Sequence, residues 1–330
     1  MAKTKIYFSK EIEKILEKLD YSKLGKKVAI KVHFGEKGCK TYINPAIVKK
    51  VYDKIISLGK KATLIECNVL YKGSRTNSTD HIRTAKENGF DFAPIDILDG
   101  EDGSEFIEIN GCKIGKGIKK YDSLVVLSHF KGHEMAGFGG AIKNIGMGLG
   151  SRAGKLHMHA SVHPKISEKC IACGECIKHC PTKAITIDKK TKKAKIADKL
   201  CIGCAMCIAV CPNGAANVSW ESRTHEDLQK NIANYTKAVL SLFPNAIFIN
   251  VLEKITPDCD CWGIIQKPVM DDVGILASTD IVAVDKASLD LANKFSSGKF
   301  DKVNETNKEN QIEIAKKLGL GSEEYEIVKI

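Results

Sequence analysis

The sequence predicts an α/β protein with a mostly parallel sheet and flanking helices, interrupted by a small inserted α+β domain. Three observations support this fold class: strand and helix patterns alternate over the first 130 residues, a short cysteine-dense segment follows, and the alternation then resumes. Alternating strands and helices predict parallel strands joined by right-handed crossovers. We therefore expect a discontinuous α/β domain (residues 1–163 and 220–330) and an inserted domain (residues 164–219).

Apolar spacing and end signals define the elements before the inserted domain. One predicted helix begins at Pro45 and stops at Gly59, because proline suits a first helical turn and glycine suits the position just after the last. A second predicted helix ends at Gly89 for the same reason. The Asn110-Gly111 pair predicts the turn of a hairpin. Buried strands are expected at residues 27–34, 62–66 and 123–128, the hairpin at 105–114, and the helices at 45–59 and 79–88.

The elements after residue 160 follow from the same patterns. Alternating apolar residues predict two short strands in the inserted domain. Thr279 is expected to cap a helix that continues to about Phe295, and Asn307 to begin a last helix. The short strands are expected at residues 184–188 and 194–197, a further helix at 224–243, and two buried strands at 246–252 and 273–277.

The inserted domain carries two copies of one cysteine pattern, each with the spacing C-x2-C-x2-C-x3-C-P. This spacing binds [4Fe–4S] clusters in bacterial-type ferredoxins, where the fourth cysteine of each run ligates the other cluster. The sequence therefore predicts a ferredoxin-like domain with two clusters. An alternative, a pair of zinc knuckles, also uses four ligands per metal, but the doubled order closed by proline favours the clusters. We assign one cluster to Cys170, Cys173, Cys176 and Cys211, and the second to Cys201, Cys204, Cys207 and Cys180.

The net charge of +11 raises the question of a nucleic-acid partner. Only four of the 51 basic residues are arginines, the residue type preferred for bidentate phosphate and base contacts, and the lysines are scattered. The densest basic run, residues 189–195, lies between the two cysteine motifs and is expected to be a solvated turn. The charge pattern thus disfavours nucleic acid and suits an acidic redox partner protein or an anionic small molecule.

No segment predicts export or membrane insertion. The first ten residues lack the apolar run of a signal peptide, and no stretch approaches the ~18 apolar residues of a membrane span. Thirteen cysteines in such a chain are expected to be metal ligands or free thiols, not disulfides. We therefore expect a cytoplasmic protein that does not contact a membrane.

A second informative segment is rich in glycine and histidine. Eight of the 23 residues from Gly132 to Gly154 are glycine, and the segment follows the carboxyl end of a predicted parallel strand, where open α/β sheets bind ligands. Turns with surface histidines are the alternative. No recognisable nucleotide or flavin motif is present, because G-x-G-x-x-G is absent and Leu156 stands where Walker A needs Ser or Thr. The candidate catalytic residues are Lys131, His133, Lys143 and His157; the candidate cofactor-binding residues are Gly139, Gly140, Asn144, Arg152 and His159.

Residues after other predicted strands could complete a pocket. His33 and Glu36 follow the first of these strands, and Glu66, Asn68 and Arg75 follow the next. The pair Cys259 and Cys261 comes after a later strand, and its two thiolates could chelate a further soft metal ion. Free buried thiols are the alternative for this pair.

Several segments together resemble the DUF362 family (domain of unknown function 362), in its branch described as uncharacterised iron–sulfur centre proteins. They cover nearly the whole chain, at residues 32–36, 42–45, 66–71, 128–133, 139–148, 259–261 and 277–285. The resemblance implies that the ferredoxin-like insertion occurs where this branch carries it. It also implies that the pocket is a site, but not what the pocket binds, because the family has no general assigned reaction.

The leading hypothesis is a redox protein in which two clusters pass electrons to a substrate or cofactor in the pocket. Lys131, His133, Lys143 and His157 would bind an anionic group and supply protons, which suits reduction chemistry. The sequence leaves open whether the chain is such an oxidoreductase or a non-enzymatic electron carrier or metallocentre assembly factor. An iron–sulfur sensor on nucleic acid is a third hypothesis.

Overall fold

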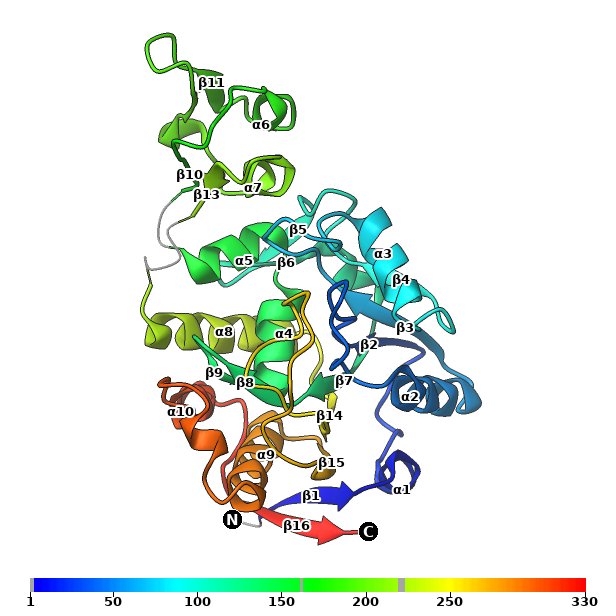
Figure 1. Cartoon of the computed structure of the whole chain (residues 1–330). Coiled ribbons are helices and arrows are strands. Elements are labelled where there is room, and N and C mark those ends of the chain that lie inside the picture. The colour runs from blue at the N-terminus through cyan, green and yellow to red at the C-terminus, as the bar shows by residue number, and fades with distance from the viewer. Residues whose placement is uncertain (1–2, 161–162, 219–222) are drawn as a thin grey trace.

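The computed structural model describes residues 3–160, 163–218 and 223–330. Within them, one mixed sheet of eight strands forms the centre of the molecule (Figure 1). From one edge to the other, its strands are β16 (Tyr325–Lys329), β1 (Thr4–Ser9), β15 (Gly274–Ser278), β14 (Ile247–Leu252), β7 (Ser123–His129), β2 (Lys27–Lys31), β3 (Lys61–Glu66) and β4 (Ile95–Ile97).

The sheet is parallel over most of its width. The five strands from β14 to β4 run parallel to their neighbours, as the alternation of strand and helix patterns predicts. At the other edge, β15 is antiparallel to β14 and to β1, and β16 pairs with β1 in parallel. The predicted fold class, an α/β protein with a mostly parallel sheet and flanking helices, is confirmed.

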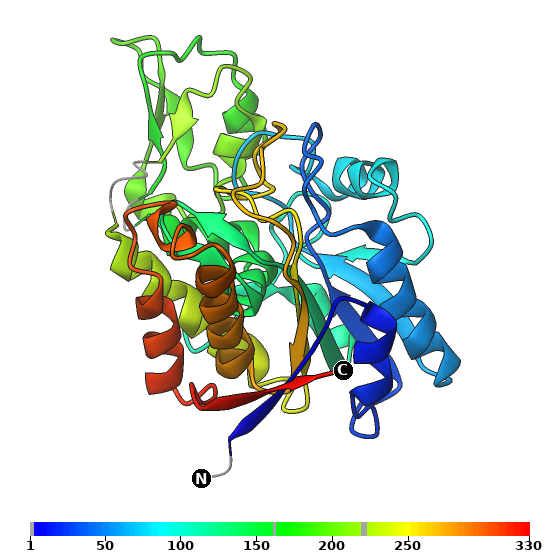
Figure 2. The ribbon, with the colours of Figure 1, turned by 60° about the horizontal axis from the view of Figure 1, so that its bottom comes forward.

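Helices cover both faces of the sheet, as Figure 2 shows from a second direction. They are α1 (Ile12–Lys18), α2 (Pro45–Ser57), α3 (Ser78–Glu87), α4 (Ala141–Leu149), α5 (Arg152–His159), α8 (His225–Leu240), α9 (Ile281–Phe295) and α10 (Glu309–Lys317). Short elements join them: the hairpin β5 (Phe106–Ile109) and β6 (Cys112–Gly115), the 3₁₀ helices η1 (Lys116–Lys120) and η4 (Phe300–Lys302), and the strands β8 (Lys131–His133) and β9 (Gly137–Gly139).

Strand β7 contributes to two apolar cores because successive strand residues point to opposite faces. Leu124 and Val126 pack in a core with residues of α4, α8, α9 and α10, whereas Val125 and Leu127 pack in a second core with residues of α1 and α2. Because β7 is buried on both faces, its sequence is apolar almost without interruption, and this pattern predicted the strand.

The cysteine-rich segment (residues 163–218) stands away from the large sheet, beyond α5 (Figure 1). Its two ends pair with each other as β10 (Lys165–Ile166) and β13 (Ala216–Asn217). Both expected short strands are present, as β11 (Ile185–Ile187) and β12 (Ala194–Ile196). The segment also contains the short helices α6 (Glu175–Lys178), α7 (Met206–Val210) and η2 (Asp198–Leu200).

The structure differs from the sequence expectations in several elements. The strand expected at residues 27–34 ends at Lys31, and β1, β4, β16 and α1 lie where no element was expected. The largest difference lies in the glycine-rich segment, which forms two helices, α4 and α5. Its glycines permit close packing: a Cβ added to Gly146 would lie 2.2 Å from the Ile232 carbonyl oxygen of α8. No helix in the described residues is long and apolar enough to cross a membrane.

Candidate functional site

A cavity of about 710 Å³ lies at the carboxyl ends of the parallel strands. The last residues of β2, β3 and β7, which are Lys31, Glu66 and His129, all line it. Open α/β sheets bind ligands at this edge. The remaining charged, histidine and cysteine residues of its wall are His33, Glu36, Cys67, Lys72, Arg75, Lys131, His133, Glu134, Lys143, Lys155, His159, Asp258, Cys259 and Cys261.

Most of the residues selected from the sequence lie in this wall. Lys131, His133, Gly139, Gly140, Lys143, Asn144 and His159 line the cavity, together with the suggested wall residues His33, Glu36, Glu66 and Arg75. Three others, His157, Arg152 and Asn68, do not line it. The buried Asn68 side chain instead donates to the Asp99 carboxylate and to the Gly100 carbonyl oxygen.

His157 and Arg152 point to other parts of the molecule. His157 is exposed on α5, and its Nδ1 lies 3.0 Å from the Tyr235 hydroxyl. The fully buried Arg152 guanidinium donates to the backbone carbonyl oxygens of Val69, Thr76 and Asp102, and its Nη1 lies 3.2 Å from Met206 Sδ in the cysteine-rich segment. Arg152 therefore connects three loops and the cysteine-rich segment.

A buried ion pair forms the floor of the cavity. Lys31 Nζ lies 3.0 Å from Glu66 Oε1 and donates to Asn144 Oδ1 at 2.7 Å. Burial lowers the pKa of Lys31, and the neighbouring Glu66 charge opposes this effect. Glu66 Oε2 is buried and has no hydrogen-bond partner among the described residues. This oxygen is therefore an acceptor available to a ligand.

Asp260 forms a second buried charge cluster behind the wall. Its carboxylate accepts from His129 Nδ1 at 2.8 Å, from Lys131 Nζ at 2.7 Å and from the Thr41 hydroxyl at 3.1 Å. Burial alone would raise the pKa of Asp260, but the charges of His129 and Lys131 hold it well below its ordinary value. Lys131 is thus neutralised by a carboxylate.

Lys143 and Lys155 are buried lysines of the cavity wall that lack a paired carboxylate in the described part of the chain. Among the described residues, neither forms an ion pair with a carboxylate: Lys143 Nζ lies 3.8 Å from Cys259 Sγ, and Lys155 Nζ donates to the Gly150 carbonyl oxygen at 2.6 Å. Burial, with the nearby Lys131 charge, lowers the pKa of Lys143 to about 7. A buried cation without a counter-ion is destabilised, so an anionic ligand would stabilise it.

Two of the cavity histidines, His133 and His159, are held neutral. Burial, reinforced by the charge of Lys143, places the pKa of His133 well below its ordinary value and lowers that of His159 to about 4. His133 Nδ1 accepts from the Ala136 amide at 3.0 Å, so the proton of the neutral ring is on Nε2. His133 can therefore donate a hydrogen bond through Nε2.

Arg75 organises the rim next to β2. Its Nε lies 3.1 Å from Glu36 Oε2, and its two terminal nitrogens lie 2.7 Å from the Tyr71 hydroxyl and 3.0 Å from His33 Nε2. The Arg75 side chain is only 1% exposed, so its charge is used within the wall, where Glu36 balances it. Burial, together with the Arg75 and Lys131 charges, lowers the pKa of His33 well below its ordinary value.

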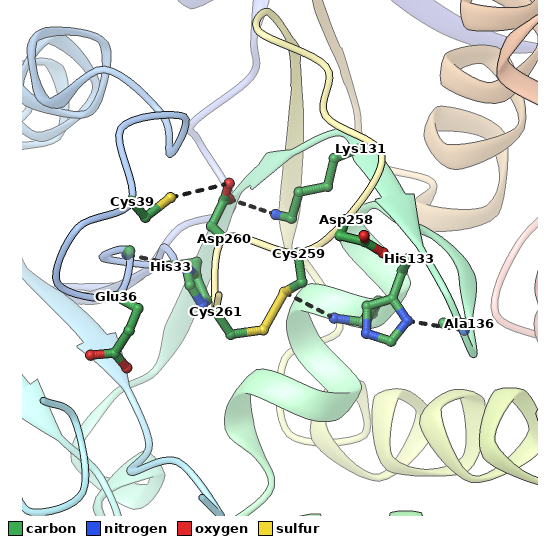
Figure 3. The surroundings of a disulfide bond; sticks show 12 residues. His33, Glu36, Cys39, Lys131, His133, Ala136, Asp258, Cys259, Asp260 and Cys261 are labelled. Atoms are coloured by element: carbon green, nitrogen blue, oxygen red, sulfur yellow. Dashed lines mark hydrogen bonds and ion pairs between the residues drawn. A yellow bond between two sulfur atoms is a disulfide. The ribbon is translucent and has the colours of Figure 1, made fainter. Parts of the chain in front are cut away.

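Cys259 and Cys261 form a disulfide whose surroundings are drawn in Figure 3. This pairing corrects the expectation that no cysteine of the chain would be disulfide-bonded; the two residues flank Asp260, and the fold turns both side chains to the same side. The ligand atoms of His33, Cys259 and Cys261 lie within 4.8 Å of one another, so the reduced pair could hold a metal ion with His33. Eleven other cysteines are free in the structure.

Asp285 occupies the start of the glycine-flanked helix α4. Its carboxylate accepts from the Ala141 amide at 2.7 Å, the Ile142 amide at 2.9 Å and Asn250 Nδ2 at 2.7 Å. A Cβ on Gly140 would lie 2.5 Å from Asp285 Oδ1, so glycine is needed there for this approach. The amides that could have bound an anion at this helix start are therefore already satisfied.

The cysteine-rich segment contains two small cavities, each lined by four cysteines. The wall of each combines three cysteines of one run with the last cysteine of the other. One group is Cys170, Cys173, Cys176 and Cys211, and the other is Cys180, Cys201, Cys204 and Cys207. Backbone amides donate to several of these sulfurs, among them Ala184 to Cys180 at 3.2 Å and Ala215 to Cys211 at 3.1 Å.

Three important residues were not selected from the sequence: Lys31, Lys155 and Asp260. A lysine at the end of an otherwise apolar strand is a signal that could have identified Lys31. Asp260 is recognisable only through contacts with residues about 130 positions away, which no local pattern predicts.

Comparison with known proteins places the chain in a family. Residues 28–290 match the family model described as "Domain of unknown function (DUF362)". No curated protein matches the chain. Among solved structures, the fold is similar to the lactate racemase apoprotein from Thermoanaerobacterium thermosaccharolyticum, with 13% identity and a TM-score of 0.44 over 88% of this chain and 57% of that one. A Thermotoga maritima protein gives 9% identity and a TM-score of 0.38 over 87% of this chain and 56% of that one. The chain spans little more than half the length of either structure.

Proposed function

The chain belongs to the DUF362 family, whose function is unknown, and from its own residues we propose that it is an iron–sulfur redox protein. In this proposal, two [4Fe–4S] clusters in residues 164–219 deliver electrons to an anionic substrate or cofactor in the main cavity. The cavity residues that hold the ligand are Lys143, Lys155, His133 and His159, supported by Lys31 and Lys131. Arg152 and His157 are left out because they lie outside the cavity wall.

The grouping of the cysteines supports the clusters. Each group has four sulfurs, the number that a [4Fe–4S] cluster needs. Each group also takes three cysteines from one run and the fourth from the other run, as in two-cluster ferredoxins. The amides that donate to Cys180 and Cys211 favour thiolates, as hydrogen bonds to ligating sulfurs do. The clusters would supply one-electron chemistry; the chain's own residues bind the ligand and provide protons.

Helix α5 is the observation that carries the proposal. On one side, Leu156 packs in the apolar cluster that includes Cys176 and Cys207, and a Cβ added to Gly203 would lie 3.7 Å from Leu156 Cδ2. Lys155 and His159 of the same helix line the main cavity. One short helix therefore contacts both the cysteine groups and the ligand cavity. The group containing Cys204 is the one next to α5, since the Cys204 charge acts on Arg152.

The charges of the cavity support an anionic ligand. Lys31, Lys131 and Arg75 are neutralised by Glu66, Asp260 and Glu36, which leaves Lys143 and Lys155 as buried lysines of the wall without a paired carboxylate among the described residues. The wall also contains Lys72, Glu134 and Asp258, which form no ion pair in that part of the chain. Lys143, with a pKa of about 7, can bind an anion as the ammonium ion or release a proton to a reduced product.

Metal analysis tests the clusters. Anaerobic purification should yield about eight iron and eight acid-labile sulfide per chain. About two zinc ions without sulfide would contradict the proposal and support zinc knuckles.

Sulfate binding tests the cavity, because sulfate stays doubly charged across the accessible pH range. Lys143→Ala should weaken sulfate binding about ten- to a hundred-fold, the cost of one charge-assisted contact. Lys308→Ala is the control. Like Lys143, Lys308 is a buried lysine, but it donates to backbone carbonyl oxygens and does not line the cavity. Unchanged iron content in both variants, with equal sulfate affinity, would favour the electron-carrier or assembly-factor hypothesis over the enzyme.

A further inference from the structure

We propose that the Cys259–Cys261 disulfide is redox-active and accepts the electron pair that enters the main cavity. The inference rests on the proposed function, because it takes the two clusters as the source of electrons. It gives the cavity a two-electron acceptor that is part of the chain. Both cysteines line the cavity wall.

The backbone around the disulfide is rigidly held. The Cys259 carbonyl oxygen accepts from the Trp262 amide at 3.2 Å and from Gln266 Nε2 at 3.2 Å. The Asp260 carbonyl oxygen accepts from the Glu36 amide at 3.1 Å, and the Cys261 carbonyl oxygen from the Tyr71 hydroxyl at 3.1 Å. All three carbonyl groups therefore accept hydrogen bonds that hold the backbone, so the two Cα atoms, 5.2 Å apart, keep a spacing that a disulfide can bridge.

Asp260 determines where the sulfurs point. Its side chain is turned into the protein by His129, Lys131 and Thr41, away from the disulfide (Figure 3). The flanking side chains of Cys259 and Cys261 lie on the other side, in the cavity wall. Cys259 is only 3% exposed, whereas Cys261 is partly exposed, so Cys261 is the sulfur that a ligand can reach.

The surroundings favour reduction of the disulfide. Lys143 Nζ lies 3.8 Å from Cys259 Sγ, and the His33 ring lies within 4.8 Å of both sulfurs. A cation next to a sulfur stabilises the thiolate, and stabilising the reduced form raises the reduction potential of a disulfide.

The step balances with the clusters as reductant. The S–S bond breaks and the disulfide takes up two electrons and one proton, giving the Cys259 thiolate next to Lys143 and the Cys261 thiol. The electrons come from one-electron oxidation of each of the two reduced clusters, and the proton comes from solvent through the cavity. When the disulfide re-forms, the two electrons and the proton pass to an anionic acceptor in the cavity.

A thiol–disulfide titration of the full chain tests the pair without using the clusters. Protein equilibrated in dithiothreitol buffers of increasing reducing power is alkylated and digested, and mass spectrometry follows the peptide that contains Cys259 and Cys261. We expect one reversible transition in which both thiols appear together. A peptide that is alkylated at every potential, or a disulfide that resists reduction in the folded protein, overturns the inference. So does about one metal ion per chain that is lost in both Cys259→Ser and Cys261→Ser.

Lys143→Met supplies a sharper readout. Losing the cation next to Cys259 should make the disulfide about tenfold harder to reduce, which is about 30 mV for a two-electron couple. Lys308→Met, which removes a buried lysine outside the cavity, should leave the midpoint unchanged. Equal midpoints for Lys143→Met and the unmodified protein would overturn the role of the cation and the inference that depends on it.

Electron delivery is tested separately with a photochemically generated one-electron reductant. Reduced clusters should expose both thiols in the unmodified protein, while Cys204→Ser, which lacks a ligand of the cluster next to α5, should retain the disulfide. Cys173→Ser tests the other cluster in the same way. Dithiothreitol should still reduce the pair in both variants if they fold. A pair that titrates with dithiothreitol but not through intact clusters would contradict the proposed electron delivery and leave the redox-active pair standing.

Discussion

Lys131 Nζ lies 2.7 Å from Asp260 Oδ2, and the same carboxylate oxygen lies 2.8 Å from His129 Nδ1. The carboxylate is completely buried, and its two basic partners are almost completely so. His129 Nε2 lies 2.9 Å from the Glu253 carbonyl oxygen, so both ring nitrogens face acceptors. One carboxylate thus fixes the last residue of β7, the first residue of β8 and the loop that carries Cys259 and Cys261.

Asp260→Ala should therefore destabilise the protein strongly. It leaves Lys131 and His129 buried without their counter-ion, which costs about 3–5 kcal/mol in comparable sites. Thermal unfolding should show a midpoint lowered by about ten degrees, since each kcal/mol shifts the midpoint of a domain this large by about 2–4 °C. Asp258→Ala is the matched control, because Asp258 is an aspartate of the same loop that forms no ion pair among the described residues and lines the cavity itself. Equal midpoints for the two variants would contradict this role of Asp260.

Gly146→Ala should separate α4 from α8. The added Cβ would lie 2.2 Å from the Ile232 carbonyl oxygen and 2.8 Å from Thr236 Oγ1, and overpacking of this kind costs about 1–3 kcal/mol. Gly139→Ala, whose Cβ would have its nearest neighbours at 3.7 Å, should be tolerated. Denaturant unfolding of both variants measures the difference. If Gly139→Ala were the more destabilising change, close helix packing would not explain the glycines of this segment.

The stability contributed by Asp285 should fall as the pH rises. Burial raises the pKa of Asp285 from 3.8 to about 6, so between these values the folded chain holds a proton that the unfolded chain releases. The associated stability is fully present below about pH 4 and is lost as the pH rises through about 6. A shift of this size corresponds to about 3 kcal/mol. The unfolding free energy of the unmodified protein minus that of Asp285→Asn should decrease between pH 4 and 7. A difference that is constant over this range would show that the pKa is not raised.

Cys180→Ala tests the crossed grouping of the cysteines. Cys180 lines the cavity of Cys201, Cys204 and Cys207, although it belongs to the other run. The substitution should damage that cluster and leave the cluster of Cys170, Cys173 and Cys176 nearly intact. Electron paramagnetic resonance of the reduced protein, compared with Cys211→Ala, distinguishes the two clusters. Damage confined to the cluster of its own run would contradict the assignment.

The cavity could be predicted in part because chain order locates strand ends. His133 and Lys143 follow a buried parallel strand, and the pattern that predicted the strand placed them at its carboxyl end. The sequence did not show that His159 lines the cavity and His157 does not, because this difference depends on the helix α5. The many glycines of the segment gave no indication of a helix there. Lys155 and His159 are four positions apart and share one helix face, whereas His157 points to Tyr235.

The remaining features depend on contacts between distant segments. The antiparallel edge arises because β1 pairs with β15, and no local pattern near Thr4–Ser9 specifies that partner. The disulfide depends on how Asp260 is held by residues of two other segments. Periodicity identifies which residues are buried, but it does not identify which buried residues meet.

The pairing of β10 with β13 has a consequence for protein engineering. Lys165 lies opposite Asn217 and Ile166 opposite Ala216, so the chain enters and leaves the cysteine-rich segment at one point. No strand of the large sheet lies between them, and α5 precedes the segment while α8 follows it. A short turn could therefore replace the whole segment without changing the order of the sheet, and a different electron-transfer unit could be grafted onto the same two-stranded neck.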